Sequence, residues 1–276
     1  AQLISLKSGS GTEYIWQRDP AHWKSSSPLL FPTVGNCRDG KYTLNGQIYS
    51  IPKHGFCRNA DFAVSVLSEQ EASFILTDSP ETRAHYPFAF HLKLTYALTE
   101  DGIRIHYTVT NPGTGPMYYQ LGAHPGFNCP LHSGERFEDY VLEFEQEGTA
   151  GYHSYDLNRM EFNMNSYTPI LDHAAVIPLT HELFANDAIF FTDLRSKKVA
   201  LKNQATGYGV EVSYPDFATV AFWTAAATKA PFLCVEPWNG SAIRSDEDDN
   251  FLNRHFLQKV ESGESKEYQI WIKKIS

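Results

Sequence analysis

The chain has 276 residues, of which 42% are hydrophobic and 14% aromatic, enough apolar material for a buried core in one large domain or two small ones. Its 32 acidic and 23 basic residues give a formal net charge of -9, which opposes binding to nucleic acid or to an anionic membrane because a polyanion would be repelled. No apolar run is long enough to span a bilayer and the first residues lack a signal-peptide pattern, so we expect a cytoplasmic protein.

The four cysteines are widely spaced and form no C-x-x-C pair, which is typical neither of a zinc knuckle nor of a dense disulfide framework. We therefore expect free thiols at Cys37, Cys57, Cys129 and Cys234.

Helical patterns are few and short in this chain. The best candidates are residues 20–26 and residues 246–256. Between them, residues 87–98 alternate between apolar and polar side chains, and after a turn at 99–102 the alternation resumes in 103–111, which predicts an antiparallel hairpin. The side chains expected to face inward are Phe88, Phe90, Leu92, Leu94, Tyr96, Leu98, Ile103, Ile105, Tyr107 and Val109. His91 and His106 fall on the wet faces, where a solvated strand surface is expected.

The same period of two recurs at residues 140–145, 198–203, 209–214 and 267–274, separated by connections rich in Gly, Pro, Asn and Asp. Many strands with almost no helical period favour a sandwich or barrel of antiparallel sheets. No internal repeat or composition shift divides the chain, so we expect one all-β domain over residues 1–276.

Three segments depart from plain strand patterning, and the first is residues 31–62, rich in Gly and Pro. His54 and Arg58 stand four residues apart on this irregular stretch, where both could point into one pocket and hydrogen-bond the hydroxyls of a polar ligand. The alternative is an exposed turn with incidental polar groups.

The second segment, residues 118–130, sets His124 among the backbone-restricting residues Gly122, Pro125 and Gly126, with Phe127 close by. A structural histidine is usually embedded in apolar alternation. The pattern here favours proton transfer or ligand binding, although a core histidine stays open.

The third segment is residues 231–240, in which Glu236 directly follows an apolar run and precedes Pro237 and Trp238. A carboxylate at the end of such a strand is partly desolvated, which raises its pKa and makes it a better base. Trp238 offers a flat apolar face that could stack on a sugar ring. The alternative is a structural glutamate that caps a loop through backbone N–H groups.

Metal and cofactor signatures are weak. Eleven histidines could suggest a metal-dependent barrel, but no H-x-H or H-x-x-x-H spacing falls in a suitable strand. No P-loop, dinucleotide fingerprint or nucleophile elbow is present. We therefore expect no metal and no cofactor.

Seven stretches together resemble the aldose 1-epimerase (galactose mutarotase) superfamily, and within it the lactose-operon branch of bacterial mutarotase-related proteins. In order along the chain they are TEYIWQRDPAHW, PLLFPTVG, HGFCRNADF, YPFAFHLKLTY, LGAHPGFNCPL, LFANDAIFF and CVEPWNG. The resemblance implies a large antiparallel β-sandwich with few short helices, whose concave sheet binds a pyranose.

The resemblance also implies roles for individual residues. His124 would be the general acid and Glu236 the general base, starting as a cationic imidazole and an anionic carboxylate that attract each other. His54 and Arg58 would line the sugar site, and Asp187 would bind sugar hydroxyls. Further substrate contacts are expected from Trp238, Phe127 and Arg38.

Two departures from the family pattern stand out. Relatives commonly carry Gly-Arg where this chain has Gly35-Asn36, so an arginine expected near the sugar is missing, and Arg38 is the candidate to replace it. The chain also opens inside what looks like the family segment GA-x-L-x-S, which implies that a preceding strand pair is missing.

The expected partner is a small-molecule sugar, with the protein a monomer or homodimer that binds neither nucleic acid nor membrane. The leading interpretation is a mutarotase for a free aldohexose. A second is a hexose-6-phosphate mutarotase with a phosphate clamp of Lys53, Arg38, Arg58 and Arg83. A third is a carbohydrate-binding or sensing protein without turnover, and a metal-dependent β-barrel enzyme is a more distant one.

Overall fold

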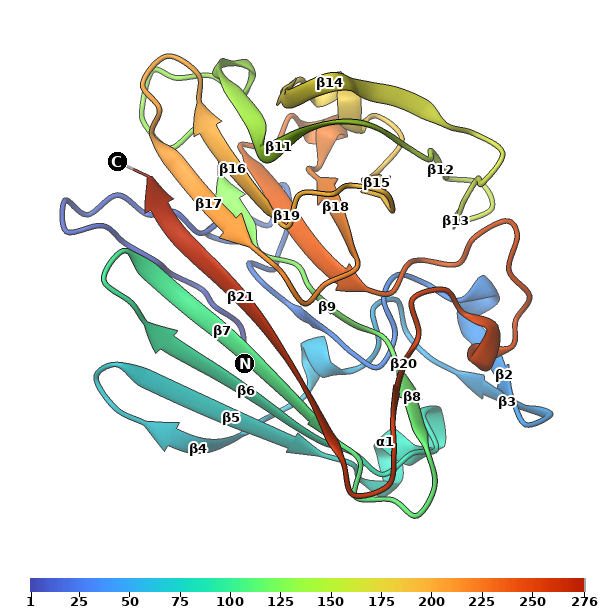
Figure 1. The fold of residues 1–276 in the computed structure, drawn as a ribbon. Coiled ribbons are helices and arrows are strands. Elements are labelled where there is room, and N and C mark those ends of the chain that lie inside the picture. The colour runs from blue at the N-terminus through green and yellow to red at the C-terminus, as the bar shows by residue number, and fades with distance from the viewer. Residues whose placement is uncertain (276) are drawn as a thin grey trace.

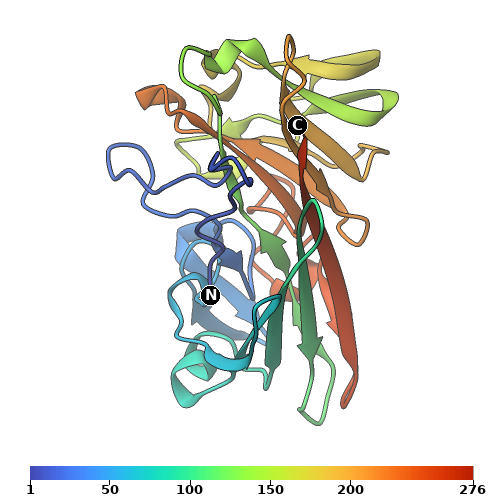
Figure 2. The same cartoon turned by 90° about the vertical axis from the view of Figure 1, so that its left-hand side faces the viewer.

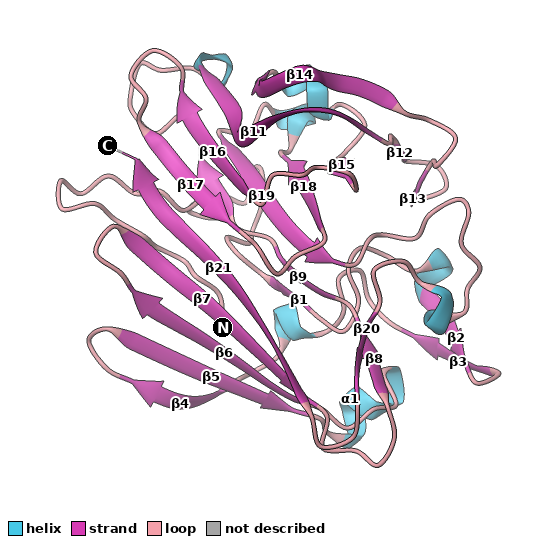
Figure 3. Ribbon diagram, in the orientation of Figure 1, coloured by secondary structure: helices cyan, strands magenta, loops and turns pink. Residues whose placement is uncertain are grey.

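The computed structural model describes residues 1–275, and most of its regular structure is β-strand (Figure 3). Nine strands form the larger sheet in the order β14-β11-β16-β17-β21-β7-β6-β5-β4, which spreads from β14 to β4 in Figure 1. Their bounds are β4 Ala63–Leu67, β5 Glu71–Thr77, β6 His91–Leu98, β7 Gly102–Thr110, β11 Tyr140–Tyr152, β14 Thr168–Pro178, β16 Lys198–Asn203, β17 Gly209–Ser213 and β21 Ser265–Ile275.

The smaller sheet has six strands in the order β1-β9-β19-β18-β15, with β10 also paired to β19, and every pairing is antiparallel. Its strands are β1 Leu29–Leu30, β9 Leu121–Ala123, β10 Gly126–Asn128, β15 Ile189–Phe191, β18 Thr219–Trp223 and β19 Phe232–Asn239. Three two-stranded ribbons complete the fold: β2 Lys41–Leu44 with β3 Gln47–Ser50, β8 Met117–Tyr119 with β20 Gln258–Val260, and β12 Tyr155–Asp156 with β13 Glu161–Phe162.

The hairpin expected in residues 87–111 is present as β6 and β7, in register from His91–Thr110 to Leu98–Ile103. The inward positions of β7 are buried as predicted, as are Leu92 and Leu94 of β6. Leu98 was predicted to face inward, and this is wrong, since its side chain is 55% exposed at the end of the strand next to the turn. The strands expected at 140–145, 198–203, 209–214 and 267–274 are confirmed as β11, β16, β17 and β21.

Both helix predictions are wrong. Residues 20–26 form turns and no helix. The amides of His22 and Trp23 both donate to the Asp19 carbonyl, and no further helical turn follows. In residues 246–256 there is one 3₁₀ turn, η6 (Phe251–Asn253). The α-helix within the described residues is α1 (Pro80–His85), whose N-cap Ser79 accepts from the Thr82 amide, with Pro80 at the first helical position.

One large apolar cluster lies between the two sheets and takes side chains from both. Strand β19 divides its side chains between two surroundings: Leu233 and Val235 enter that cluster, whereas Cys234 and Trp238 join smaller clusters on the opposite face. Because strand side chains alternate, Glu236 shares the face of Cys234 and Trp238. That face carries the candidate site.

The N-terminal segment (dark blue in Figure 2) lies against the smaller sheet, where Ile15 forms an antiparallel bridge with Phe127 of β10. All four cysteines are buried free thiols, as expected. Among residues 1–275, no helix has both the length and the apolar character needed to cross a membrane.

Candidate active site

A cavity of about 250 Å³ opens on the face of β19 away from the main core. Its walls include three tryptophans, Trp23, Trp223 and Trp238. The titratable side chains that line it are Lys53, His54, Arg58, His124, Tyr155, Asp187 and Glu236. An apolar wall with a few convergent polar groups is the usual composition of a small-molecule site.

Glu236 reaches the cavity from the middle of β19, where its backbone pairs with Ala221 of β18. Its side chain is 2% exposed. A strand with neighbours on both sides fixes its backbone, so the carboxylate is held by the sheet rather than by a mobile loop.

His124 lies between β9 and β10, and two glycines there have little room for a side chain. A Cβ on Gly126 would lie 3.0 Å from Trp23 Cζ3 and 3.3 Å from Cys234 Sγ, and one on Gly122 would lie 2.6 Å from Trp238 Cδ1. The Val235 amide donates to the carbonyl of Pro125 at 3.1 Å, which ties the segment to β19. The residues around His124 therefore bring its backbone close to the strand of Glu236.

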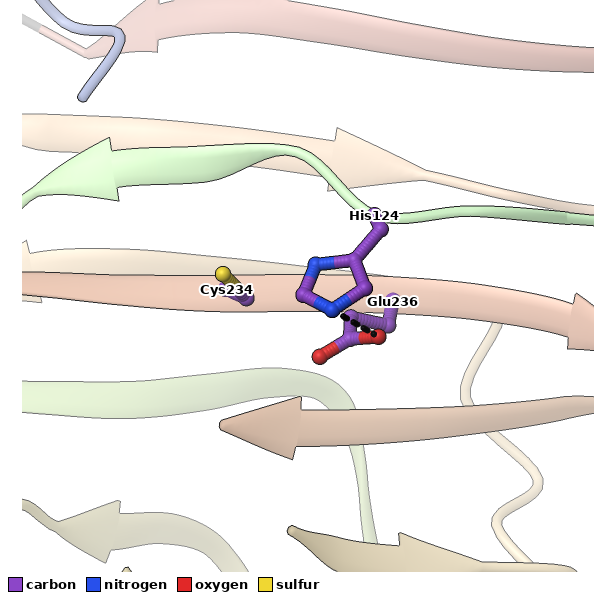
Figure 4. A group of neighbouring side chains, drawn as sticks. All are labelled: His124, Cys234 and Glu236. Atoms are coloured by element: carbon purple, nitrogen blue, oxygen red, sulfur yellow. Dashed lines mark ion pairs between the residues drawn. The ribbon is translucent and has the colours of Figure 1, made fainter. Parts of the chain in front are cut away.

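The two side chains meet, as Figure 4 shows: His124 Nε2 lies 3.1 Å from Glu236 Oε2. Burial raises the pKa of the Glu236 carboxyl well above its usual value, and the charge of Asp187 raises it further, against the opposing effect of Lys53 and Arg58. Burial also lowers the pKa of the His124 imidazole, and Arg58 and Lys53 lower it further. Both shifts favour neutral groups.

This protonation differs from the expected one, in which mutual attraction favours a cationic imidazole and an anionic carboxylate. The reason is desolvation, since each charged form loses water in this cavity. The neutral pair and the charged pair contain the same number of protons. They differ only by transfer of one proton between His124 and Glu236 across the 3.1 Å contact.

Aromatic rings enclose the imidazole of His124 on several sides. Trp23 stacks on it with ring centroids 4.9 Å apart and an interplanar angle of 26°. His54 and Trp223 contact it edge-on, with centroid distances of 5.6 and 5.7 Å. These contacts restrict the rotation of His124 and exclude water from its faces.

His54 has a defined tautomer. Its Nδ1 accepts a hydrogen bond from the Gly35 amide at 3.0 Å, so the ring proton is on Nε2, where it is available as a donor. Burial lowers its pKa well below the usual value, which keeps the ring neutral. The left-handed backbone at His54 (φ 68°) and Gly55 (φ 71°) turns the chain here, and a Cβ on Gly55 would lie 2.1 Å from the Phe31 carbonyl oxygen.

Charged groups occupy the remainder of the cavity wall. Arg58, in the 3₁₀ turn η2 (Cys57–Asn59), has Nη2 3.4 Å from Ser25 Oγ, and Lys53 Nζ lies 6.0 Å from the ring centroid of Tyr155. Asp187 follows the 3₁₀ turn η4 (His181–Phe184) in a left-handed conformation, and its Oδ1 accepts from the Ala188 amide at 2.8 Å. One oxygen of that carboxylate therefore stays available for a ligand.

Two expected substrate contacts lie outside the cavity wall. Arg38 donates to Asp249 at 2.6 Å and to Glu161 at 3.1 Å, and these two ion pairs hold its guanidinium away from the site. Phe127 is completely buried in the main core, because its position on β10 points opposite to the cavity. Neither residue contacts a ligand in that cavity without rearrangement.

Asn36 stands where the resemblance led us to expect an arginine, and it makes two hydrogen bonds. The Asn36 amide nitrogen donates to the Met160 carbonyl, and its Oδ1 accepts from the Tyr155 hydroxyl at 3.0 Å. Asn36 thus orients Tyr155 in the cavity wall rather than supplying a charge.

Sequence reasoning did not assign a site role to Trp23, Trp223 or Cys234. The local pattern around Trp23 resembled a short helix, which hid its place beside His124. For Cys234 a signal existed, because residues 234 and 236 are two apart on a strand and must share a face.

Comparisons with known proteins identify the family of this chain. A family model described as aldose 1-epimerase matches residues 1–248. The chain is 33% identical over 265 residues to the chromosomal protein LacX of Lactococcus lactis subsp. lactis, covering 94% of this chain and 88% of that protein.

Solved structures with the same fold include a galactose mutarotase related enzyme from Lactobacillus acidophilus, with a TM-score of 0.92 and 30% identity, covering 99% of this chain and 91% of that one. A galactose mutarotase-like protein from Lactobacillus casei aligns with a TM-score of 0.91 and 28% identity, covering 99% of this chain and 93% of that one.

Proposed function

The chain belongs to the aldose 1-epimerase family, and on this basis we propose that it interconverts the α and β anomers of a free aldohexose by opening and reclosing the sugar ring. The observation that carries the proposal is the buried contact between His124 and Glu236. Binding alone requires no pair of titratable groups held in water-excluded contact, whereas acid–base catalysis does. A sugar-binding protein without turnover is therefore the weaker interpretation.

The size and walls of the cavity suit one monosaccharide. Its volume of about 250 Å³ is slightly below the range of roughly 300–1,000 Å³ typical of drug-sized ligands. Tryptophan faces can cover the apolar C–H side of a pyranose, while the Nε2–H of His54 and a free oxygen of Asp187 offer a donor and an acceptor to its hydroxyls.

Ring opening needs one proton removed and one added. Glu236 takes the proton of the anomeric hydroxyl while His124 delivers a proton to the ring oxygen, and the bond between C1 and that oxygen breaks. The free aldehyde rotates about the C1–C2 bond, and the reverse transfers close the ring on its other face. No proton is gained or lost overall, and each transfer contributes on the order of 100-fold or more in rate.

The protonation favoured by burial corresponds to one stage of this cycle. Once the ring is open, the pair consists of a neutral imidazole and a protonated carboxyl, the form that desolvation favours in the empty cavity. A sugar with a closed ring can therefore react only after one proton has returned from Glu236 to His124. Lys53 and Arg58 lower the pKa of both partners, so their charges oppose protonation of either group.

Polarimetry on freshly dissolved α-galactose and α-glucose tests the proposal. The wild-type protein should accelerate the approach to anomeric equilibrium for at least one of them. Glu236→Gln, which keeps the shape of the carboxyl but cannot accept the proton, should not. Acceleration of neither sugar, or full activity in Glu236→Gln, would contradict the proposed function.

A second candidate is a hexose-6-phosphate mutarotase, and Lys53 and Arg58 at the cavity favour it. Of the four residues expected to bind a phosphate, only these two line the cavity. Arg38 is engaged in its two ion pairs, and Arg83 on α1 donates from Nε to Asp78 at 2.6 Å. Lys53→Met separates the candidates. For a phosphorylated substrate its kcat/KM falls at least about tenfold while that for the free hexose changes little, since a charge-assisted hydrogen bond contributes about 1.5–3 kcal/mol.

A further inference from the structure

Cys234 lies beside the His124–Glu236 pair, although the proposed reaction does not use it. It precedes Glu236 by two residues on β19, so both side chains leave the strand on the same face. One ligand atom from each of His124, Cys234 and Glu236 lies within 4.8 Å of the other two, and all three residues are buried (Figure 4). The fold thus assembles nitrogen, sulfur and oxygen donors around one point.

The spacing of these donors fits a thiophilic divalent ion. Zinc bonds of about 2.0–2.3 Å in tetrahedral geometry separate the ligand atoms by roughly 3.3–3.8 Å. Side-chain movements of about 1 Å therefore bring the three atoms to bonding distance, within the freedom of staggered rotamers and their neighbours. Histidine, cysteine and glutamate are all side-chain types that bind zinc in proteins.

An unused nitrogen provides a second, independent indication. His124 Nδ1 is buried and has no hydrogen-bond partner among residues 1–275, while Nε2 faces Glu236. In Figure 4 this second ring nitrogen lies on the side of the imidazole toward Cys234. A buried nitrogen without a partner is costly, and an ion would satisfy it once the ring proton has moved to Nε2.

Charge balance also favours such an ion. Starting from the neutral pair and the thiol, a divalent cation replaces one proton on Cys234 and one on Glu236, and both protons leave to solvent. The thiolate and carboxylate then neutralise the two positive charges, so the cavity gains no net charge. A low-dielectric site tolerates a neutral complex far better than an isolated ion.

We propose that His124, Cys234 and Glu236 form an inhibitory binding site for a thiophilic divalent ion of the Zn²⁺ and Cd²⁺ class. The bound ion occupies a Glu236 lone pair needed for proton transfer and prevents His124 from becoming a cation, so the ion and the sugar exclude one another. The binding itself does not depend on the proposed function; only its inhibitory consequence does.

Cadmium titration of the whole chain tests the site directly. Bound Cd²⁺ should produce a thiolate-to-cadmium charge-transfer absorption that saturates at one ion per chain, with release of about two protons. Cys234→Ala should abolish the absorption and weaken Cd²⁺ binding at least about tenfold. Cys129→Ala is the matched control, because Cys129 is equally buried and free but lies in the main core, and this variant should keep the wild-type absorption.

Thermal unfolding and near-ultraviolet circular dichroism establish that each variant is folded. If Cys234→Ala does not fold, His124→Asn serves in its place and should weaken Cd²⁺ binding to a similar extent. The proposal is overturned if wild-type protein gives no charge-transfer absorption, if Cys129→Ala loses it equally, or if the folded site variant binds Cd²⁺ as wild type does.

A second arm measures mutarotation with and without Cd²⁺. Inhibition should be reversed by a chelator, and a higher sugar concentration should raise the apparent inhibition constant. If the protein accelerates no mutarotation yet binds Cd²⁺ through Cys234, the metal site stands and the proposed function fails. If it is an active mutarotase that Cd²⁺ does not inhibit, the inhibitory role fails and the proposed function stands.

Discussion

Two histidine–glutamate contacts in this molecule have similar lengths and opposite surroundings. On the nine-stranded sheet, His106 Nε2 of β7 lies 3.5 Å from Glu267 Oε2 of β21, with side chains 26% and 62% exposed. In the cavity of the six-stranded sheet the His124–Glu236 distance is 3.1 Å, with side chains 9% and 2% exposed. The chemical groups are the same, so the environment accounts for any difference between the pairs.

Water reaches the first pair from the side of Glu267, and a contact that is open to solvent in this way contributes about 0–1 kcal/mol. The second pair has lost its water, so burial shifts the pKa of each partner toward the neutral form. A proton can then move between the two groups without either charge being favoured strongly by solvent. The catalytic potential of a histidine–glutamate contact thus comes from its desolvation and from a cavity that admits a substrate.

The largest expected difference between the pairs is catalytic. His124→Asn should lower kcat/KM for mutarotation on the order of 100- to 10,000-fold, because asparagine cannot donate the proton to the ring oxygen. His106→Asn, the matched change on the nine-stranded sheet, should leave kcat/KM within about twofold. Stopped-flow polarimetry measures both, and equal effects of the two substitutions would remove the basis of the comparison.

A smaller effect is expected from the aromatic enclosure of His124. Trp23→Leu removes the ring stacked at 4.9 Å, a contact of about 1 kcal/mol, and should lower kcat roughly fivefold; KM should rise as well, because Trp23 also lines the cavity. It should also shift the acidic limb of the pH–rate profile upward, since water admitted to the imidazole raises its pKa. Trp271→Leu on β21 is the control. A Trp23→Leu enzyme with an unshifted pH profile would argue for a merely structural role.

The smallest expected effect is on stability. The folded-state pKa of Glu236 is raised above its unfolded value of about 4.3, so the folded chain retains a proton that the unfolded chain has lost. Glu236 therefore lowers the free energy of unfolding as the pH rises above the unfolded pKa, and the lowered pKa of His124 offsets this below about pH 6.5. Glu236→Gln should be more stable than wild type at pH 8 by about 1 kcal/mol, a Tm increase of roughly 2–4 °C.

At pH 4 that advantage should largely disappear, because the carboxyl is then mostly protonated in both states. The exposed counterpart Glu267→Gln should change the free energy of unfolding by less than about 0.5 kcal/mol at either pH. A Glu236→Gln variant less stable than wild type at pH 8 would show that the carboxylate is not destabilised by burial.

The sequence predicted the nine-stranded sheet better than the six-stranded one, for a physical reason. Strand β7 has one face in the core and one toward water, so its residues alternate visibly. All eight residues of β19 are buried, since one face meets the core and the other the cavity, and a continuous apolar run does not reveal which side is which.

Long-range partners set a second limit on prediction. Residue type and local pattern drew attention to His124 and Glu236 separately, and only the resemblance to a family joined them. Arg38 illustrates the converse: its partners Glu161 and Asp249 are distant in sequence, so nothing nearby indicated that its charge was already engaged. Trp23 was hidden in a segment whose short-range pattern resembled a helix.

A double-mutant cycle on anomer exchange measures whether His124 and Glu236 act together. Magnetisation-transfer NMR of an equilibrated aldohexose gives the exchange rate for wild type, His124→Asn, Glu236→Gln and the double variant. If the two residues act as one proton-transfer unit, each single substitution lowers the catalysed rate about 100-fold or more and the double variant is no slower than the slower single one. Losses that multiply in the double variant, or a Glu236→Gln protein that exchanges anomers at the wild-type rate, would contradict the account.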